Sequence, residues 1–385
     1  MVPLRPAEPF TALKDHDPIL CPTVTGRYFP LPADPSSRTR AGRRGRPLRA
    51  RPALAALAAA AAFVAGCGSG GSGVSKDPVT QVSTSGGVQE KVRAALTPSA
   101  DRFPATGGKT LQALANEIGG GSQMGLASSV FVAGRENRLA FGVIDRNAGF
   151  LYGPTAVYVA RTPESPAKGP YPAPADVLVT DVPYRSKQAA TESDPFAAIY
   201  AAEVPFGRPG KYSVMAVSLV NGKPVAAPGA ISVLPQGRDR IPEVGDMAPR
   251  VATDTVASAR GDLSAIDTRQ PPSPDLHRKS LTDVLGKKPV ALLFATPQLC
   301  QSRVCGPVVD EALQLKTKYG DRIEFIHQEV YKDNNPSKGL REPLLRYHLA
   351  TEPWLFVINK QGRITARLEG SFGLDAFERA LKTAL

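Results

Sequence analysis

The chain has 385 residues, which is long enough for two domains of ordinary size with extensions. Its net charge of +12 could indicate a nucleic-acid partner, but half of that excess lies in residues 1–66, which hold ten basic and four acidic residues. No basic run with interleaved aromatic residues follows, so the composition favours a mildly basic, solvated surface and no nucleic-acid binding.

Residues 38–67 have the pattern of an export signal. The basic stretch RTRAGRRGRPLRARP is followed by the apolar ALAALAAAAAFVAGC, which is too short to span a bilayer. Its last four residues, Val64 to Cys67, resemble the bacterial lipobox, in which the cysteine thiol receives a diacylglyceryl group. The resemblance implies that residues 1–66 are a leader and that Cys67 is the site of lipidation. Because 66 residues exceed a normal signal peptide, one interpretation is that residues 1–37 precede the start codon that the cell uses.

Residues 67–122 are predicted to be a lipid-anchored tether and linker. The sequence GSGGSGVS after Cys67 is flexible and polar, and two short helix-like segments, KVRAAL and KTLQALANEIG, follow it. Acyl chains on Cys67 would hold the protein at the cell membrane. We therefore expect a lipid-anchored protein on the extracytoplasmic face.

Residues 123–236 are predicted to form an all-β sandwich that resembles an immunoglobulin domain. The segment from Arg208 to Tyr212 resembles the tyrosine corner of such domains, and the Pro-rich segment 162–176 is expected to be an irregular crossover or an edge excursion. Without histidine or cysteine, this region is expected to be a spacer or an interaction domain. Seven β-prone runs are separated by Pro and Gly, at 128–133, 138–144, 155–161, 175–182, 197–204, 211–220 and 230–235.

Residues 237–385 are predicted to form an α/β domain, so the chain is multi-domain. Its opening, Gly245 to Pro249, reads GDMAP and resembles peroxiredoxin-like and membrane-tethered thioredoxin-like proteins. After a short helix at 279–286, the order β-α-β-α-β-β-α matches the thioredoxin fold. The expected elements of that order are a strand at 288–296, a helix at 307–320, a strand at 322–331, a helix at 341–350, a hairpin at 351–370 and a helix at 374–385.

Cys300 and Cys305 lie between the first strand and the first helix of this order, where thioredoxins carry their redox cysteines. In a regular helix, a five-residue offset would turn the two side chains about 140° apart, so a loop must bring Cys300 back. Two alignments remain open. Either Cys300 is the nucleophile and Cys305 resolves, or Cys305-Gly-Pro307-Val matches the thioredoxin C-G-P-C. A helix N-terminus and Arg303 lead us to expect a lowered thiol pKa.

The resemblance also implies a cis peptide bond before Pro353, which would shape the peptide-binding face with Trp354 beside it. The residue before this proline is Glu352, whereas Thr, Val or Ile is common in the family. The predicted activity is thiol–disulfide exchange with extracytoplasmic protein thiols and disulfides, through Cys300 and Cys305 and without cofactor or metal.

Three alternatives remain open at this stage. Sco-like copper chaperones use two cysteines in C-x-x-x-C spacing and a histidine before the later strand; here the spacing differs, and His327 and His348 are the nearest candidates. Peroxiredoxins place their cysteine in a P-x-x-x-T/S-x-x-C pattern, from which Pro297 to Cys300 departs. Finally, the two cysteines could form a purely structural disulfide in a binding module.

Overall fold

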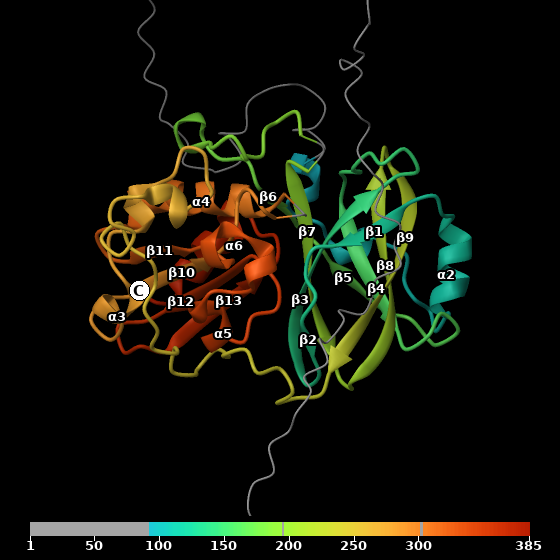
Figure 1. Ribbon diagram of the computed structural model, residues 1–385. Helices are drawn as coiled ribbons and strands as arrows, with labels where there is room; N and C mark the ends of the chain where they lie inside the picture. Colours follow the sequence, from blue (N-terminus) through green and yellow to red (C-terminus); the bar gives the residue numbers. More distant parts are fainter. Residues whose placement is uncertain (1–91, 195, 301–302) are drawn as a thin grey trace, which may run out of the picture. The chain divides into compact units, whose positions relative to one another are not determined.

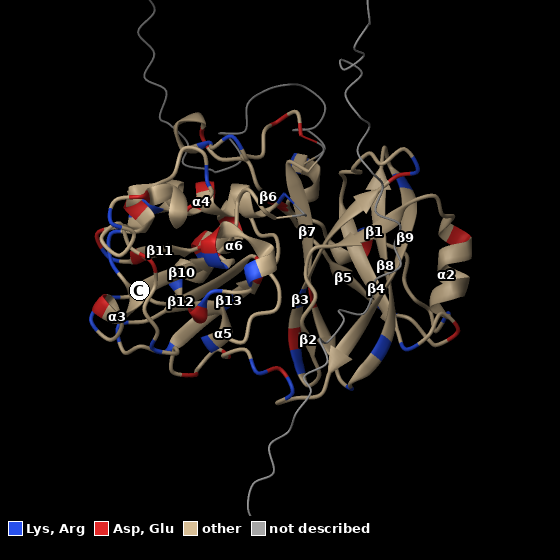
Figure 2. Cartoon of the chain, viewed as in Figure 1, with Lys and Arg blue, Asp and Glu red and all other residues tan. Residues whose placement is uncertain are grey.

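The computed structural model describes residues 92–194, 196–300 and 303–385. The predicted leader, the lipobox with Cys67 and the first part of the tether lie outside these residues. Within the described part of the chain, no helix is both long and apolar enough to cross a membrane. Charged residues of both signs are interspersed along the described chain (Figure 2).

The β-rich region consists of two sheets that pack on a shared core (Figure 1). One sheet is antiparallel throughout and has the order β1 (Gln123–Leu126), β3 (Arg135–Ile144), β7 (Ala198–Phe206) and β6 (Ala175–Val177). The other has the order β2 (Phe131–Val132), β9 (Lys223–Leu234), β8 (Gly210–Val220), β4 (Thr155–Ala160) and β5 (Lys168–Pro172), with β2 and β9 parallel.

The chain packs onto these sheets well before residue 123. Val92 and Ala95 belong to the core between the sheets, and helix α2 (Leu111–Ile118) covers the outer face of the five-stranded sheet. Thr110 caps α2 by accepting a hydrogen bond from the backbone of Ala113 (3.1 Å). Part of the segment that the sequence indicates as linker therefore contributes to the folded body.

The structure has more strands here than the sequence predicts. The seven predicted runs overlap observed strands, but β1 and β5 are additional. Strand β5 lies in the Pro-rich segment and is an edge strand, where proline costs no ladder hydrogen bond toward solvent. The Tyr212 hydroxyl donates to the backbone carbonyl of Arg208 (2.9 Å), which is the kind of hydrogen bond that the predicted tyrosine corner requires.

The α/β region has one mixed sheet with helices on both faces, and its elements follow the predicted order (Figure 1). The sheet order is β11 (Glu324–Gln328), β10 (Val290–Phe294), β12 (Trp354–Ile358) and β13 (Ile364–Glu369), and only β10 and β11 are parallel. The helices are α3 (Leu281–Val284), α4 (Cys305–Tyr319), α5 (Glu342–Arg346) and α6 (Leu374–Lys382).

Alternate residues of the central strands belong to two separate cores, one on each face of the sheet. Leu293 and Leu355 pack with α4 and α6 on one face, whereas Leu292 and Phe356 pack with α3 and α5 on the other. Both central strands are buried throughout, which explains why their sequences are continuous apolar runs.

The short 3-10 helices are η2 (Ala100–Arg102), η3 (Val182–Tyr184), η4 (Leu263–Ala265), η5 (Pro274–Leu276), η6 (Lys332–Asn334) and η7 (Pro336–Lys338).

Candidate functional site

A folded-back loop brings Cys300 to the head of helix α4. After strand β10, the carbonyl of Thr296 accepts hydrogen bonds from the backbones of Leu299 (3.2 Å) and Cys300 (3.0 Å). The carbonyl of Cys300 then accepts one from Arg303 (3.2 Å), whose φ of 61° is left-handed. The chain thereby reverses before Cys305, which is the first residue of α4. This reversal brings Cys300 back toward Cys305, as contact between two cysteines five positions apart requires.

The two thiols share a hydrogen bond and belong to one core cluster. Cys300 is 8% exposed and Cys305 is fully buried. Burial raises the pKa of the Cys305 thiol well above its ordinary value, and the contact with Cys300 raises it further. The expected lowering of a thiol pKa is therefore wrong for Cys305. Cys305 is therefore the more deeply buried thiol of the two, and Cys300 is the more accessible one.

A carboxylate on the cis-proline loop faces the thiol pair. The Glu352–Pro353 peptide bond is cis, as the resemblance implies. Burial and the charge of Cys300 raise the pKa of Glu352 to about 7, while a hydrogen bond with Tyr331 opposes the shift. Burial, with contributions from Glu352 and both cysteines, raises the pKa of Tyr331 to about 12. Glu352 can therefore gain or lose a proton beside the thiols at neutral pH.

A segment of the β-rich region, residues 181–190, covers the first turns of α4. Gly306 lies so close to it that a Cβ atom would overlap the carbonyl oxygen of Gln188. The Asp310 carboxylate accepts hydrogen bonds from the backbone (3.0 Å) and hydroxyl (2.9 Å) of Ser186. The segment therefore lies against the first turns of α4, whose first residue, Cys305, is fully buried.

The other predicted site residues lie around the pair in different ways. Pro307 is buried in the first turn of α4. The guanidinium of Arg303 lies 5.1 Å from the centre of the Phe196 ring, and Arg303 is not among the groups that shift the pKa of Cys305. Trp354 belongs to the core cluster on the opposite face of the sheet from the cysteines. The Trp354 side chain therefore does not lie on the face of the sheet that carries the thiols, because successive side chains of a strand alternate between its two faces.

Sequence reasoning missed Tyr331 and the role of Glu352. The unusual residue before Pro353 was a visible signal, since a carboxylate there is a departure from the pattern. Nothing in the sequence marks Tyr331, which follows β11 in an irregular segment.

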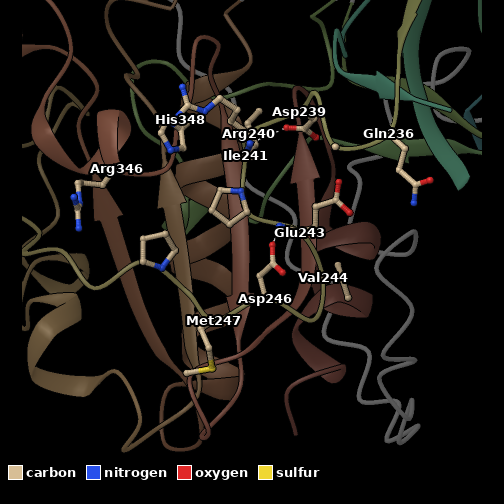
Figure 3. Close-up of a pocket in the computed structure, with 13 residues that line it drawn as sticks. Gln236, Asp239, Arg240, Ile241, Glu243, Val244, Asp246, Met247, Arg346 and His348 are labelled. Atoms are coloured by element: carbon tan, nitrogen blue, oxygen red, sulfur yellow. Dashed lines mark hydrogen bonds between the residues drawn. The ribbon is translucent and has the colours of Figure 1, made fainter. Parts of the chain in front are cut away.

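Among the residues that the structure describes, neither cysteine belongs to a cluster of three or more candidate metal ligands. Within the described chain, the one group of three or more candidate ligands consists of Asp267, His277 and His327, and it includes neither thiol. His348 is exposed and lines an open groove along residues 236–249 (Figure 3). The Cys–Cys–His arrangement of the copper alternative is therefore not assembled among these residues.

No family model and no curated protein matches the sequence. The solved structures that are similar to this chain include two from Chlorobium tepidum. One is a Chlorobium tepidum protein assigned as thiol:disulfide interchange protein DsbE, with 17% identity and a TM-score of 0.26; the match covers 37% of this chain and 98% of that one. The other is described as a thiol:disulfide interchange protein of the thioredoxin family from Chlorobium tepidum TLS, with 16% identity and a TM-score of 0.26; it covers 37% of this chain and 97% of that one.

Glu352→Gln is expected to raise the unfolding midpoint of the reduced protein at pH 8 and to change it little at pH 5. The folded-state pKa of about 7 lies above the unfolded value of about 4.3. Stability from the protonated carboxyl is thus complete at low pH and is lost as the pH rises through 7. The glutamine side chain is neutral at both pH values, so the stability of Glu352→Gln does not fall in this way as the pH rises. Thermal unfolding at both pH values measures the effect. Glu342→Gln, on the exposed surface of α5, is the matched control, and an identical pH profile for the wild type and Glu352→Gln would refute the raised pKa.

Proposed function

We propose that this protein is a membrane-tethered, extracytoplasmic, thioredoxin-like protein that carries out thiol–disulfide exchange through Cys300 and Cys305. The observation that carries the proposal is the contact between the two thiols at the head of α4, with the Glu352 carboxyl beside them. The lipobox-like residues before Cys67 support the tether. The tyrosine corner at Tyr212 supports an immunoglobulin-like relationship for the β-rich region.

The exchange step follows from the different burial of the two thiols. The Cys300 thiolate attacks one sulfur of a partner disulfide, forming a mixed disulfide and releasing the partner's other sulfur as a thiolate that takes up a proton. Cys305 then loses its proton and attacks the Cys300 sulfur. The Cys300–Cys305 disulfide forms, and the partner's first sulfur leaves as the second thiol. The protein loses two electrons and two protons, and the partner disulfide gains them; the reverse sequence oxidises a partner dithiol.

Glu352 supports the proton movement in this sequence. Its pKa of about 7 lets its carboxylate accept a proton from a thiol near neutral pH and return it to a leaving thiolate. The hydrogen bond with Tyr331 stabilises the charged carboxylate and so opposes the effect of burial.

A redox titration of the full chain tests the proposal. Cys21 and Cys67 are replaced by Ser so that only the proposed pair remains, and the oxidised fraction is measured in glutathione buffers by alkylation and gel shift. We expect a reduction potential above about −250 mV, because structural disulfides lie below about −300 mV. A potential in the lower range, or no disulfide at all, would contradict exchange and favour a structural role.

Single-cysteine variants test the assigned roles. Cys305→Ser leaves the less buried thiol and is expected to form a mixed disulfide with glutathione. Cys300→Ser leaves a buried, protonated thiol and is expected to react at least about tenfold more slowly. Faster reaction of the Cys300→Ser variant would reverse the assignment of nucleophile and resolving cysteine.

A further inference from the structure

Three buried side chains that the thiol chemistry does not use converge beside strand β11. Asp267 follows η4, His277 follows η5, and His327 lies within β11. Asp267 is 1% exposed and both histidines are fully buried. One ligand atom from each lies within 4.8 Å of the other two. The two imidazole rings meet edge to face, with centroids 5.2 Å apart.

Each histidine is oriented by a backbone carbonyl on its outer side. His327 Nε2 faces the carbonyl of Ala295 (3.0 Å), and His277 Nδ1 faces that of Asp254 (3.4 Å). A carbonyl only accepts, so the 3.0 Å contact places the ring hydrogen of a neutral His327 on Nε2, and its Nδ1 then holds a lone pair. Metal-binding histidines are oriented by the same kind of outer hydrogen bond.

The inner atoms of the three side chains face one another inside the protein. His277 Nε2 and His327 Nδ1 are buried and have no hydrogen-bond partner. They lie 3.5 Å and 3.6 Å from the two carboxylate oxygens of Asp267. Those oxygens accept backbone hydrogen bonds from Arg269 (2.9 Å) and Ser273 (2.7 Å), which fix the carboxylate. Buried lone pairs that face a carboxylate repel one another unless a cation lies among them.

The spacing of these atoms fits a metal ion better than a shared proton. The separations of 3.5 and 3.6 Å exceed the range of about 2.7–3.2 Å for a hydrogen bond. Each separation is close to the edge of a tetrahedron of ligands placed about 2.0–2.1 Å from a central ion, which is about 3.4 Å, and each histidine nitrogen faces a different oxygen of the carboxylate. Two imidazoles and one carboxylate suit Zn²⁺, whereas Ca²⁺ and Mg²⁺ prefer oxygen ligands and Cu(I) prefers sulfur.

We propose that Asp267, His277 and His327 form a buried Zn²⁺ site that is separate from the thiol pair. The site would stabilise the loop that carries Cys300. His327 holds Ala295, which directly precedes the Thr296 carbonyl that fixes Cys300. Thr268, next to Asp267, accepts a hydrogen bond from the backbone of Gln298 in the same loop (3.1 Å). The ion therefore links the segment around 267 to β11 and to the start of the loop.

Metal analysis of the full chain tests this site. The wild type is stripped with a chelator, reconstituted with Zn²⁺ alone and desalted, and bound zinc is measured by mass spectrometry. We expect about one equivalent in the wild type and in a Cys300→Ser/Cys305→Ser variant. Asp267→Asn and His327→Gln are expected to bind at least about tenfold more weakly. His348→Gln, which changes an exposed histidine in the groove of Figure 3, is the control and should bind normally.

A measurement on the unaltered protein keeps the test independent of whether the variants fold. Added Zn²⁺ is expected to raise the unfolding midpoint of the stripped wild type, since a ligand of the folded state stabilises it by mass action. Co²⁺ in place of Zn²⁺ is expected to give a tetrahedral visible spectrum without a sulfur charge-transfer band. Absence of bound zinc together with an unchanged midpoint would overturn the proposal. Zinc that is lost from the double cysteine variant but retained by Asp267→Asn would also overturn it, because the thiols would then be the ligands.

Discussion

Gly370→Ala is expected to lower the free energy of unfolding by about 3 kcal/mol or more. Gly370 has a φ of 72°, and a Cβ atom there would overlap the carbonyl oxygen of Ala127 in the β-rich region. The backbone of Gly370 also donates to the carbonyl of Pro353 (2.9 Å), so it cannot move away from Ala127 without disturbing the cis-proline loop. Both the backbone strain and the overlap must be relieved at the same point.

Hydrogen bonds of the residues next to Gly370 restrict movement of its backbone. The Glu369 carboxylate accepts backbone hydrogen bonds from Ser129 (3.0 Å) and Val130 (2.9 Å). Arg138 donates to the carbonyl of Ser371 (2.8 Å). A backbone shift at Gly370 would weaken these bonds together.

Chemical denaturation followed by the fluorescence of Trp354 measures the loss, because Trp354 is the only tryptophan of the chain and is buried. Gly339→Ala is the matched control. Gly339 has a similar φ of 77°, but no atom lies within 4 Å of an added Cβ. We expect the control to lose only about 1 kcal/mol. Equal losses in the two variants would show that backbone conformation, and not the contact with Ala127, dominates.

Much of the α/β region could be predicted from the sequence because its signals are local. The strands β10 and β12 are apolar runs buried on both faces, and the helix after Cys305 has an apolar stripe that ends at Gly320. The position of the thiols followed from the same order of elements. Their contact could not be derived from the spacing alone, because it depends on the left-handed turn at Arg303.

Features that join distant segments could not be predicted. Asp267, His277 and His327 come from three separate segments, and residues 250–278 contain no periodic pattern that would place the first two. The covering segment 181–190 lies on α4 through contacts such as Ser186 with Asp310, which are 124 residues apart. The thiol expected to be activated at the helix N-terminus is fully buried, and burial raises its pKa.

Arg269→Met is expected to lower the free energy of unfolding by about 3–5 kcal/mol, because it leaves a buried carboxylate without its cation. Arg269 Nε donates to Asp310 (2.8 Å), and the two side chains are only 6% and 0% exposed. Its other nitrogens donate to the carbonyls of Pro271 (2.6 Å) and Tyr184 (2.7 Å). One guanidinium thus joins α4, the loop after Asp267 and the covering segment.

Two further variants distinguish the contribution of the Arg269–Asp310 ion pair to stability from that of the contacts around it. In Arg269→Met/Asp310→Leu neither charge remains, so we expect the double variant to recover more than half of the lost stability. Lys338→Met removes an ion pair of similar length, 2.9 Å to Asp333, whose side chains are 54% and 75% exposed, and it should cost less than about 1 kcal/mol. A single-variant loss as small as that of Lys338→Met would contradict the prediction.

The same substitution should also expose the thiol site. The covering segment is held to α4 by Arg269 through Tyr184 and by Asp310 through Ser186. Arg269→Met removes the contact with Tyr184. The contact with Ser186 then depends on an Asp310 carboxylate that has lost its cation. In a Cys300→Ser background we therefore expect Arg269→Met to speed alkylation of Cys305 at least about tenfold under native conditions, since local opening becomes less costly. An unchanged rate would mean that Cys305 is protected by the core of the α/β region itself and not by the covering segment.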